Sequence, residues 1–457
     1  MVEAAAPPID DVGAAGALAT APLDAARRRY VLTLLMIAYA LSFLDRQVLS
    51  ILVEPIKIEL KVSDFAMGLL TGPVFVIFYT FLGVPIAWLA DRRSRPVIIT
   101  ACLTLWSAFT ALSGVASSYV PLALARLGVG FGEAGCNPSS HSLIADISSK
   151  EQRASGLAFY SLGVPIGTLL GLAMGGLVAD AYGWRAAFMV AGLPGLALAA
   201  LIGLTVRDPR PRAAPGPGAI GQSFVQPFRD LADTIRALSG KPSFWYAALA
   251  TGFSAFVGYA LLFFNASFFL RCHGPELAQI AAGFGLKSKG FLGLALGLVN
   301  GVGGFTGTVV GGWIADRAAT RDRRLFASVP AAAALVAVPA VFVTFLVPNV
   351  LPALALLFIP NVALTIWYGA VYSTAQSVVE PRRRATAAAL LLLILNLIGL
   401  GLGPTFLGAL SDFLAKTQHL GLAEGLRWAM IITGLFNLLA AGLFWMARRT
   451  VREDVVS

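Results

Sequence analysis

Residues 87–95 of the chain read AWLADRRSR, and residues 312–321 read GWIADRAATR, nearly the same sequence. A second pair of similar segments, KEQRASG at 150–156 and EPRRRATA at 380–387, lies at almost the same interval along the chain. An internal repeat on this scale is typical of a chain built from two related halves. We therefore expect two similar structural units joined by a linker.

The composition indicates an integral membrane protein. Of the 457 residues, 57% are hydrophobic and 13% are charged, and the mean hydropathy is +0.78. A soluble domain has about 45–50% apolar and about 25% charged residues, so this chain has too few charges to cover a soluble surface of its size. Its three cysteines are scattered without metal-binding or redox spacing, which argues against a disulfide framework.

Twelve segments are long and apolar enough to cross a bilayer as helices. Most of the 34 Lys and Arg residues fall in alternate loops and in both terminal segments, which predicts that both termini lie in the cytoplasm. The predicted organisation is a disordered cytoplasmic N-terminus (1–29), a six-helix bundle (30–206), a cytoplasmic linker with an amphipathic surface helix (207–243), a second six-helix bundle (244–447) and a cytoplasmic tail (448–457).

The segments that carry the repeat resemble the signatures of the major facilitator superfamily over essentially the whole chain. The Asp-Arg pairs at 91–92 and 316–317 match the core of the signature after the second span, although the first copy lacks both of its glycines. Arg126, Gly130 and Gly132 match the family's fourth-span motif. The resemblance implies an all-α membrane fold of two pseudo-symmetric six-helix bundles around a central cavity that spans 1, 4, 7 and 10 line. It also implies that Asp91, Arg92, Asp316 and Arg317 gate the cytoplasmic side.

Three further stretches resemble the spinster subfamily: FLDRQVLS at 43–50, RLGVGFGEA at 126–134 and FFLRCHGPELAQIAAGFG at 268–285. Spinster proteins are associated with the export of lysolipids and sphingosine phosphate-like amphiphiles, and the resemblance implies a similar substrate. We expect a bacterial member of this group, located in the inner membrane.

Four charged residues, Asp45, Arg46, Arg126 and Glu133, lie inside predicted spans. Inserting an ionisable side chain into the membrane interior costs about 2.5–3.5 kcal/mol, so each of these residues is a candidate functional residue. Arg126 and Glu133 are seven residues apart, so they share one helix face about 10 Å apart along the axis. We predict that Asp45 and Glu133 couple transport to protons, and that Arg46, Arg126 and Glu133 bind an anionic substrate. A structural ion pair between spans 1 and 4 is the alternative.

The second half has no intramembrane charge and many aromatic residues, which favours a substrate with a charged head and an apolar tail. Four aromatic side chains of spans 7 and 10 are predicted to contact the substrate: Phe256, Tyr259, Tyr368 and Tyr372. Asn361, Thr365 and Asn396 are further candidates for polar contacts. Four glycines of span 5 recur every four residues from Gly163 to Gly175, which predicts close helix packing.

These observations predict a monomeric, proton-coupled secondary transporter of a lysolipid or sphingosine phosphate-like amphiphile. The alternatives are a proton symporter of a small organic anion, such as a sugar acid or an aromatic acid, and a multidrug efflux carrier. We expect no enzymatic activity, cofactor, metal site or nucleic-acid partner. The G-x-G-x-x-G match at 130–135 lies within a membrane span rather than after a strand, so it does not indicate a dinucleotide site.

Overall fold

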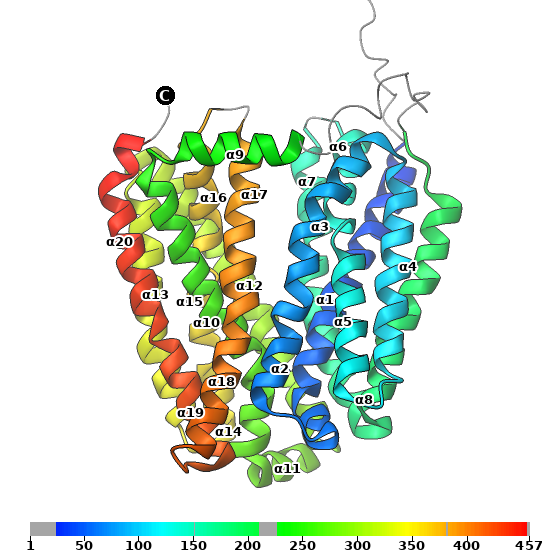
Figure 1. Ribbon diagram of the computed structural model, residues 1–457, viewed down its shortest axis with the longest axis vertical. Coiled ribbons are helices and arrows are strands. Elements are labelled where there is room, and N and C mark those ends of the chain that lie inside the picture. Colours follow the sequence, from blue (N-terminus) through cyan, green and yellow to red (C-terminus); the bar gives the residue numbers. More distant parts are fainter. Residues whose placement is uncertain (1–23, 150, 210–225, 381–382, 455–457) are drawn as a thin grey trace, which may run out of the picture.

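The computed structural model describes residues 24–149, 151–209, 226–380 and 383–454. The predicted N-terminal disorder falls largely on residues 1–23, outside this range, as does part of the predicted linker at 210–225. Figure 1 shows two side-by-side groups of helices, α1–α8 and α10–α20, with α9 (Gln226–Leu238) lying across one end. We call this end the α9 end, and the opposite one the α11 end after α11 (Gly274–Gly283).

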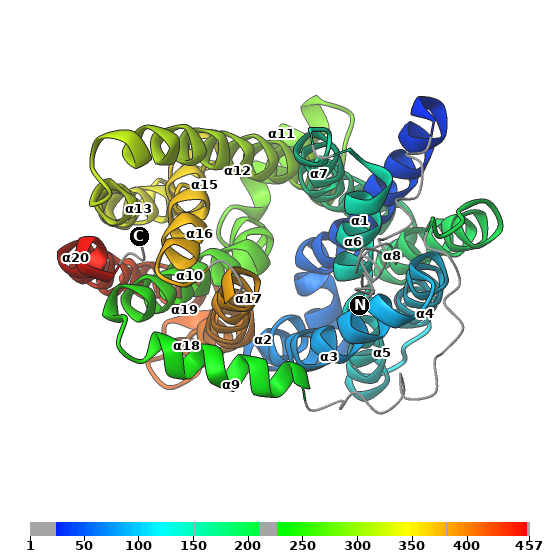
Figure 2. The same ribbon diagram turned by 90° about the horizontal axis from the view of Figure 1, so that it is seen from above.

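The first half consists of eight helical segments. They are α1 (Ala25–Leu60), α2 (Asp64–Thr71), α3 (Pro73–Arg92), α4 (Arg95–Ser113), α5 (Tyr119–Glu133), α6 (Cys136–Ile147), α7 (Arg153–Ser161) and α8 (Gly163–Thr205). The second half contains α11 and eleven further helical segments. They are α10 (Pro242–Cys272), α12 (Ser288–Arg321), α13 (Leu325–Leu346), α14 (Val350–Leu356), α15 (Phe358–Ala363), α16 (Trp367–Ser377), α17 (Arg384–Ile394), the π-helix η2 (Leu395–Leu402), α18 (Gly403–Lys416), α19 (Gly421–Gly434) and α20 (Phe436–Asp454). Viewed from above, the two halves lie next to each other (Figure 2).

Ten helical stretches of the described chain are long and apolar enough to cross a membrane. One of them, Arg153–Thr205, has 53 residues and turns at Gly183, whose φ of 85° lies in the left-handed region, so it accounts for two crossings. The segment formed by α5 and α6 supplies a twelfth crossing and contains Arg126 and Glu133. The all-α, twelve-span fold class is therefore confirmed.

The glycine row of span 5 packs closely against another helix, as predicted, and the structure shows that this helix is α1. A Cβ atom on Gly167 would lie 2.2 Å from the carbonyl oxygen of Ala40, and one on Gly171 would lie 2.6 Å from that of Leu44. Only a residue without a side chain allows this close approach. The contact fixes the position of α1 next to the residues that carry the site described below.

The two halves approach each other at the α11 end and separate toward the α9 end. Along α12, a Cβ on Gly293 would lie 2.2 Å from Leu172 of α8, and one on Gly301 would lie 3.9 Å from Pro165. A Cβ on Gly304, one turn further toward the α9 end, would meet nothing within 4 Å. The spacing between α8 and α12 therefore widens from one end of the molecule to the other.

Candidate functional site

The four intramembrane charges form two crossed ion pairs between α1 and α5. Arg126 Nη1 donates to Asp45 Oδ2 at 2.8 Å and to Oδ1 at 3.1 Å. Arg46 donates to Glu133 Oε2 through Nε at 2.8 Å and through Nη2 at 2.5 Å. Each arginine thus binds a carboxylate of the other helix, and the consecutive residues Asp45 and Arg46 reach partners two turns apart on α5.

The Asp45–Arg126 pair is almost completely buried. The side chains of both residues are 2% exposed, and Thr110 Oγ1 of α4 donates a further hydrogen bond to Asp45 Oδ1 at 2.8 Å. Within the described part of the chain, Arg126 Nε has no hydrogen-bond partner. Breaking one side of such a pair leaves a buried, uncompensated charge, which is far more costly than keeping the pair.

The Glu133–Arg46 pair is asymmetric. The Glu133 side chain is 1% exposed, whereas that of Arg46 is 15% exposed and is the most accessible of the four charges. Ser42 Oγ donates to Glu133 Oε2 at 3.0 Å, while Oε1 has no partner among the described residues. The Arg46 guanidinium lies 4.8 Å from the centroid of the Phe75 ring and 4.7 Å from that of Tyr79, so aromatic faces stabilise its positive charge.

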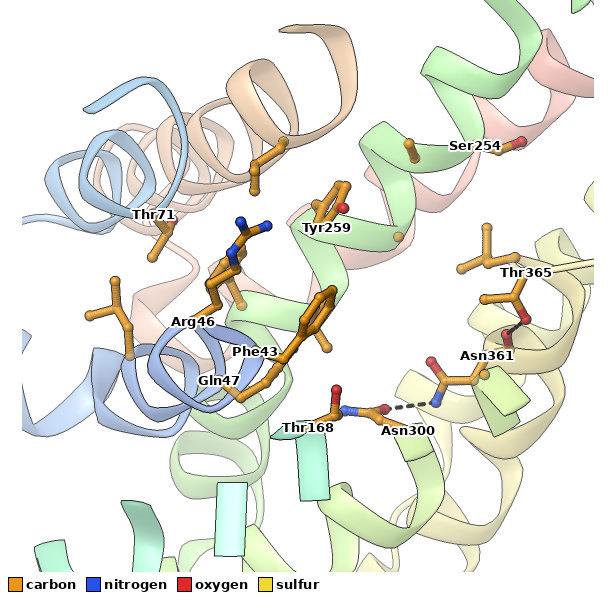
Figure 3. A pocket seen from close by; sticks show the side chains of 18 of the residues that line it. Phe43, Arg46, Gln47, Thr71, Thr168, Ser254, Tyr259, Asn300, Asn361 and Thr365 are labelled. Atoms are coloured by element: carbon orange, nitrogen blue, oxygen red, sulfur yellow. Dashed lines mark hydrogen bonds between the residues drawn. The ribbon is translucent and has the colours of Figure 1, made fainter. Parts of the chain in front are cut away.

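Arg46 faces a cavity between the two halves (Figure 3). The cavity, including its open mouth, has about 1120 Å³ of empty space. On the side of the first half, the polar side chains that line it are Arg46, Gln47, Thr71, Arg126 and Thr168.

Among the described residues, those that line the opposite wall are all uncharged. Tyr259, Leu262 and Phe263 of α10 line it together with Trp367 and Tyr368 of α16 and the polar side chains Ser254, Asn300, Asn361 and Thr365. Asn361 Nδ2 donates to Asn300 Oδ1 at 2.9 Å, which joins α15 to α12 beside the cavity (Figure 3). The predicted asymmetry between a charged and an uncharged aromatic wall is thus present in the cavity itself.

Two of the predicted aromatic side chains, Phe256 and Tyr372, are not among the residues that line this cavity. Phe256 is 5% exposed and packs against Phe406 and Phe436, with ring centroids 5.4 and 5.0 Å away. This side chain is absent from the cavity lining because its helix face points toward α18 and α20. Tyr372 is partly buried against the core cluster that contains Trp367, one helical turn beyond Tyr368.

Sequence reasoning missed several lining residues, among them Gln47, Thr71, Thr168, Ser254 and Asn300. Asn300 had a usable signal, because it is the one amide in the glycine-rich span of α12. The hydroxyl residues gave none, since Ser and Thr within a membrane helix commonly donate to their own backbone.

The predicted gating residues lie toward the ends of α3 and α12. Arg92 and Asp316 are exposed, and Arg317 is stacked over the Trp313 ring with 3.6 Å between the guanidinium carbon and the ring centroid. The Asp91 side chain lies outside the described residues. Their predicted role as a gate stays a prediction.

A polar cluster that the sequence did not reveal joins the halves at the α11 end. Arg271 of α10 donates to Asp64 Oδ1 and Oδ2 of α2 at 2.7 and 2.8 Å and to Glu54 Oε2 of α1 at 2.7 Å. Asp64 is fully buried and also accepts from Ser411 Oγ of α18 at 2.8 Å and pairs with Lys57 at 2.7 Å. These contacts link α1 and α2 of the first half to α10 and α18 of the second.

Comparison with known proteins adds independent evidence. The family model described as "Major Facilitator Superfamily" matches residues 35–404. An "MFS-type efflux pump" of Mycolicibacterium smegmatis is 32% identical over 418 residues, which cover 91% of each chain. The "Sphingosine-1-phosphate transporter SPNS2" of Danio rerio is 26% identical over 424 residues, covering 90% of this chain and 83% of that protein.

The fold is similar to that of a solved bacterial homologue of the human lysosomal transporter spinster, described as inward-facing and unoccupied. The TM-score is 0.81 and the sequence identity is 32%, with 94% of this chain and 98% of the other covered. The expected resemblance to the superfamily and to spinster proteins is confirmed by these matches.

Proposed function

Because the chain belongs to the major facilitator superfamily, we propose that it is a proton-coupled secondary transporter of a lysolipid or sphingosine phosphate-like amphiphile. The observation that carries the substrate class is the asymmetric cavity, in which Arg46, the more exposed of the two arginines that line it, faces an uncharged, aromatic wall. An anionic headgroup pairs with the Arg46 guanidinium. The apolar chain then buries its surface against Tyr259, Phe263 and Tyr368, which is favourable at about 25 cal/mol per Å².

Proton coupling follows from competition for Arg46. In the structure, Glu133 is neutralised by Arg46 and accepts a hydrogen bond from Ser42. When a phosphate or carboxylate of the substrate binds the Arg46 guanidinium in place of Glu133, Glu133 becomes a buried carboxylate without its counter-ion. Burial disfavours the charged form of such a group, so Glu133 binds a proton when the anion arrives and releases it when the ion pair re-forms. The anion and the proton are thereby bound together, the anion at Arg46 and the proton at Glu133.

Alternating access requires the cavity to open to one side at a time. The cluster around Arg271 and Asp64 closes the α11 end, while α8 and α12 diverge toward the α9 end. The distribution of Lys and Arg in the loops supports a cytoplasmic location of the α9 end. In this assignment, the structure corresponds to an inward-facing state in a bacterial inner membrane.

Efflux of multiple drugs is a second candidate, which the similarity to the mycobacterial efflux pump favours. An aromatic wall binds many apolar molecules, so the cavity also suits amphiphilic drugs. The two candidates differ in the charge of the cargo, because Arg46 favours anions and repels lipophilic cations.

Purified protein in liposomes, with and without an imposed pH gradient, separates these functions. Labelled sphingosine phosphate, a labelled lysophospholipid, ethidium and labelled glucuronate are offered in turn to the wild type, Glu133→Gln and Glu151→Gln. Glu151 is an exposed carboxylate outside the spans and serves as the matched control. We expect lipid flux that follows the gradient in the wild type and in the control, and that loses its dependence on the gradient in Glu133→Gln.

Other outcomes would replace the proposal. Gradient-driven ethidium flux without lipid flux would identify a multidrug carrier, and glucuronate flux would identify a symporter of small organic anions. Lipid flux that ignores the gradient in all three proteins would remove the proton-coupling role from Glu133.

A further inference from the structure

A second hollow lies at the α9 end of the second half, away from the central cavity. Trp445, Arg448 and Arg449 near the end of α20 line it together with Arg324, the residue before α13. None of these residues lines the central cavity. The hollow therefore lies between the beginning of one membrane helix and the end of another.

Three guanidinium groups share this hollow, and none of the described residues that line it is a carboxylate. Among the residues that the structure describes, no ion pair involves Arg324, Arg448 or Arg449. Asp322 is two positions before Arg324, but its Oδ1 already accepts from Arg452 Nη2 at 3.0 Å and from the Arg324 backbone N–H at 2.9 Å. Like charges gathered in this way repel one another, and a bound anion removes that repulsion.

The hollow also lies at the depth of a membrane surface. Trp445 is 48% exposed, and the Arg448 guanidinium lies 4.4 Å from the centroid of its ring. About two turns earlier on the same helix, Leu438 and Leu439 are 49% and 52% exposed, as expected of a face in contact with acyl chains. Tryptophan is typical of the boundary between acyl chains and headgroups, so the arginines that follow it lie at the level of phospholipid phosphates.

We propose that this hollow binds the phosphate of an anionic phospholipid such as phosphatidylglycerol. The guanidinium fork matches two phosphate oxygens, and basic pockets between membrane helices on the cytoplasmic side suit acidic headgroups. A zwitterionic lipid adds an ammonium group close to the same three arginines, which makes it a poorer ligand. Binding joins α13 to α20 from the outside of the bundle, independently of any cargo in the central cavity.

Native mass spectrometry of delipidated protein in a neutral detergent tests this proposal. Dioleoyl-phosphatidylglycerol and dioleoyl-phosphatidylcholine are titrated separately into the wild type, Arg448→Ala/Arg449→Ala and Arg27→Ala/Arg29→Ala. Arg27 and Arg29 are exposed at the start of α1, also at the α9 end (Figure 1), so this control removes the same charge from the other half. Each basic group near an anionic headgroup contributes about fivefold in affinity.

We expect the wild type and the control to prefer phosphatidylglycerol by at least tenfold, and Arg448→Ala/Arg449→Ala to bind it about 25-fold more weakly. Arg448→Lys/Arg449→Lys keeps the charge and is expected to retain most of the affinity, which separates lost charge from lost folding. Equal affinity of the wild type for the two lipids would overturn the proposal, and so would an equal loss in the control. Inorganic phosphate that binds as tightly as the lipid would also overturn it, because the hollow would then be a site for free anions.

Discussion

Arg271 is predicted to set the balance between the closed and open states of the α11 end. Its side chain is 6% exposed, and the guanidinium makes three charge-assisted hydrogen bonds to Glu54 and Asp64 of the other half. Such bonds contribute about 1.5–3 kcal/mol each, but their effects are not additive, and Asp64 keeps Lys57 when Arg271 is removed. We therefore expect Arg271→Gln to destabilise the closed state by about 3 kcal/mol, which shifts the equilibrium about 100-fold toward opening.

Cysteine labelling measures this shift. Thr405 of α18, whose hydroxyl donates to the Gly68 carbonyl oxygen of the other half at 3.2 Å, is replaced by cysteine in a protein without native cysteines. A membrane-impermeant maleimide added from the α11 side then reports opening. The matched control is Arg427→Gln. Arg427 pairs with Glu424 of the same helix, α19, so this ion pair does not connect the two halves.

Labelling of Thr405→Cys is expected to become about 100-fold faster in Arg271→Gln and to stay unchanged in Arg427→Gln. Unchanged labelling in Arg271→Gln would show that the cluster does not hold the end closed. An equal acceleration in both variants would indicate a general loosening of the fold rather than the loss of a contact between the halves.

The remaining predictions concern stability. Arg126→Gln leaves Asp45 buried and unpaired and is expected to lower the free energy of unfolding by about 3–5 kcal/mol. Adding Asp45→Asn is expected to restore most of this stability. A double variant that unfolds at the same temperature as the single variant would contradict this reasoning. Gly293→Ala places a Cβ 2.2 Å from Leu172. It is expected to lower the free energy of unfolding by about 1–3 kcal/mol and to speed cysteine labelling at the α11 end. Gly304→Ala adds a Cβ where nothing lies within 4 Å and is expected to change neither the stability nor the labelling rate. Phe256→Ala is expected to lower the free energy of unfolding by about 3–5 kcal/mol, and with it the melting temperature, while leaving the KM for lipid unchanged. A large rise in KM would instead indicate that Phe256 contacts the substrate.

The sequence was sufficient for the architecture because the bilayer imposes simple constraints. Each crossing needs about 20 apolar residues with internally satisfied backbone, so the spans can be counted from composition alone. The four charges were recognisable for the same reason, since an ionisable residue in hydrocarbon is too costly to be accidental. The span-5 glycines likewise predicted a close helix contact, although only the structure shows that the partner is α1.

Only the tertiary structure decided which charges meet. Helical periodicity places Arg126 and Glu133 on one face of α5, but the pairing depends on how α1 lies against it, and consecutive residues such as Asp45 and Arg46 point about 100° apart. The structure seals one pair and turns Arg46 toward the cavity.

The same limit applies to contacts between distant segments. Arg271 and Asp64 are far apart in sequence, yet they meet across the two halves. Phe256 and Tyr259 are almost adjacent in sequence, yet Phe256 packs against other phenylalanines while Tyr259 lines the cavity. Local sequence determined the helices and their burial because both follow from the solvent. The partners of each side chain were decided by the packing of the two halves, which no single helix encodes.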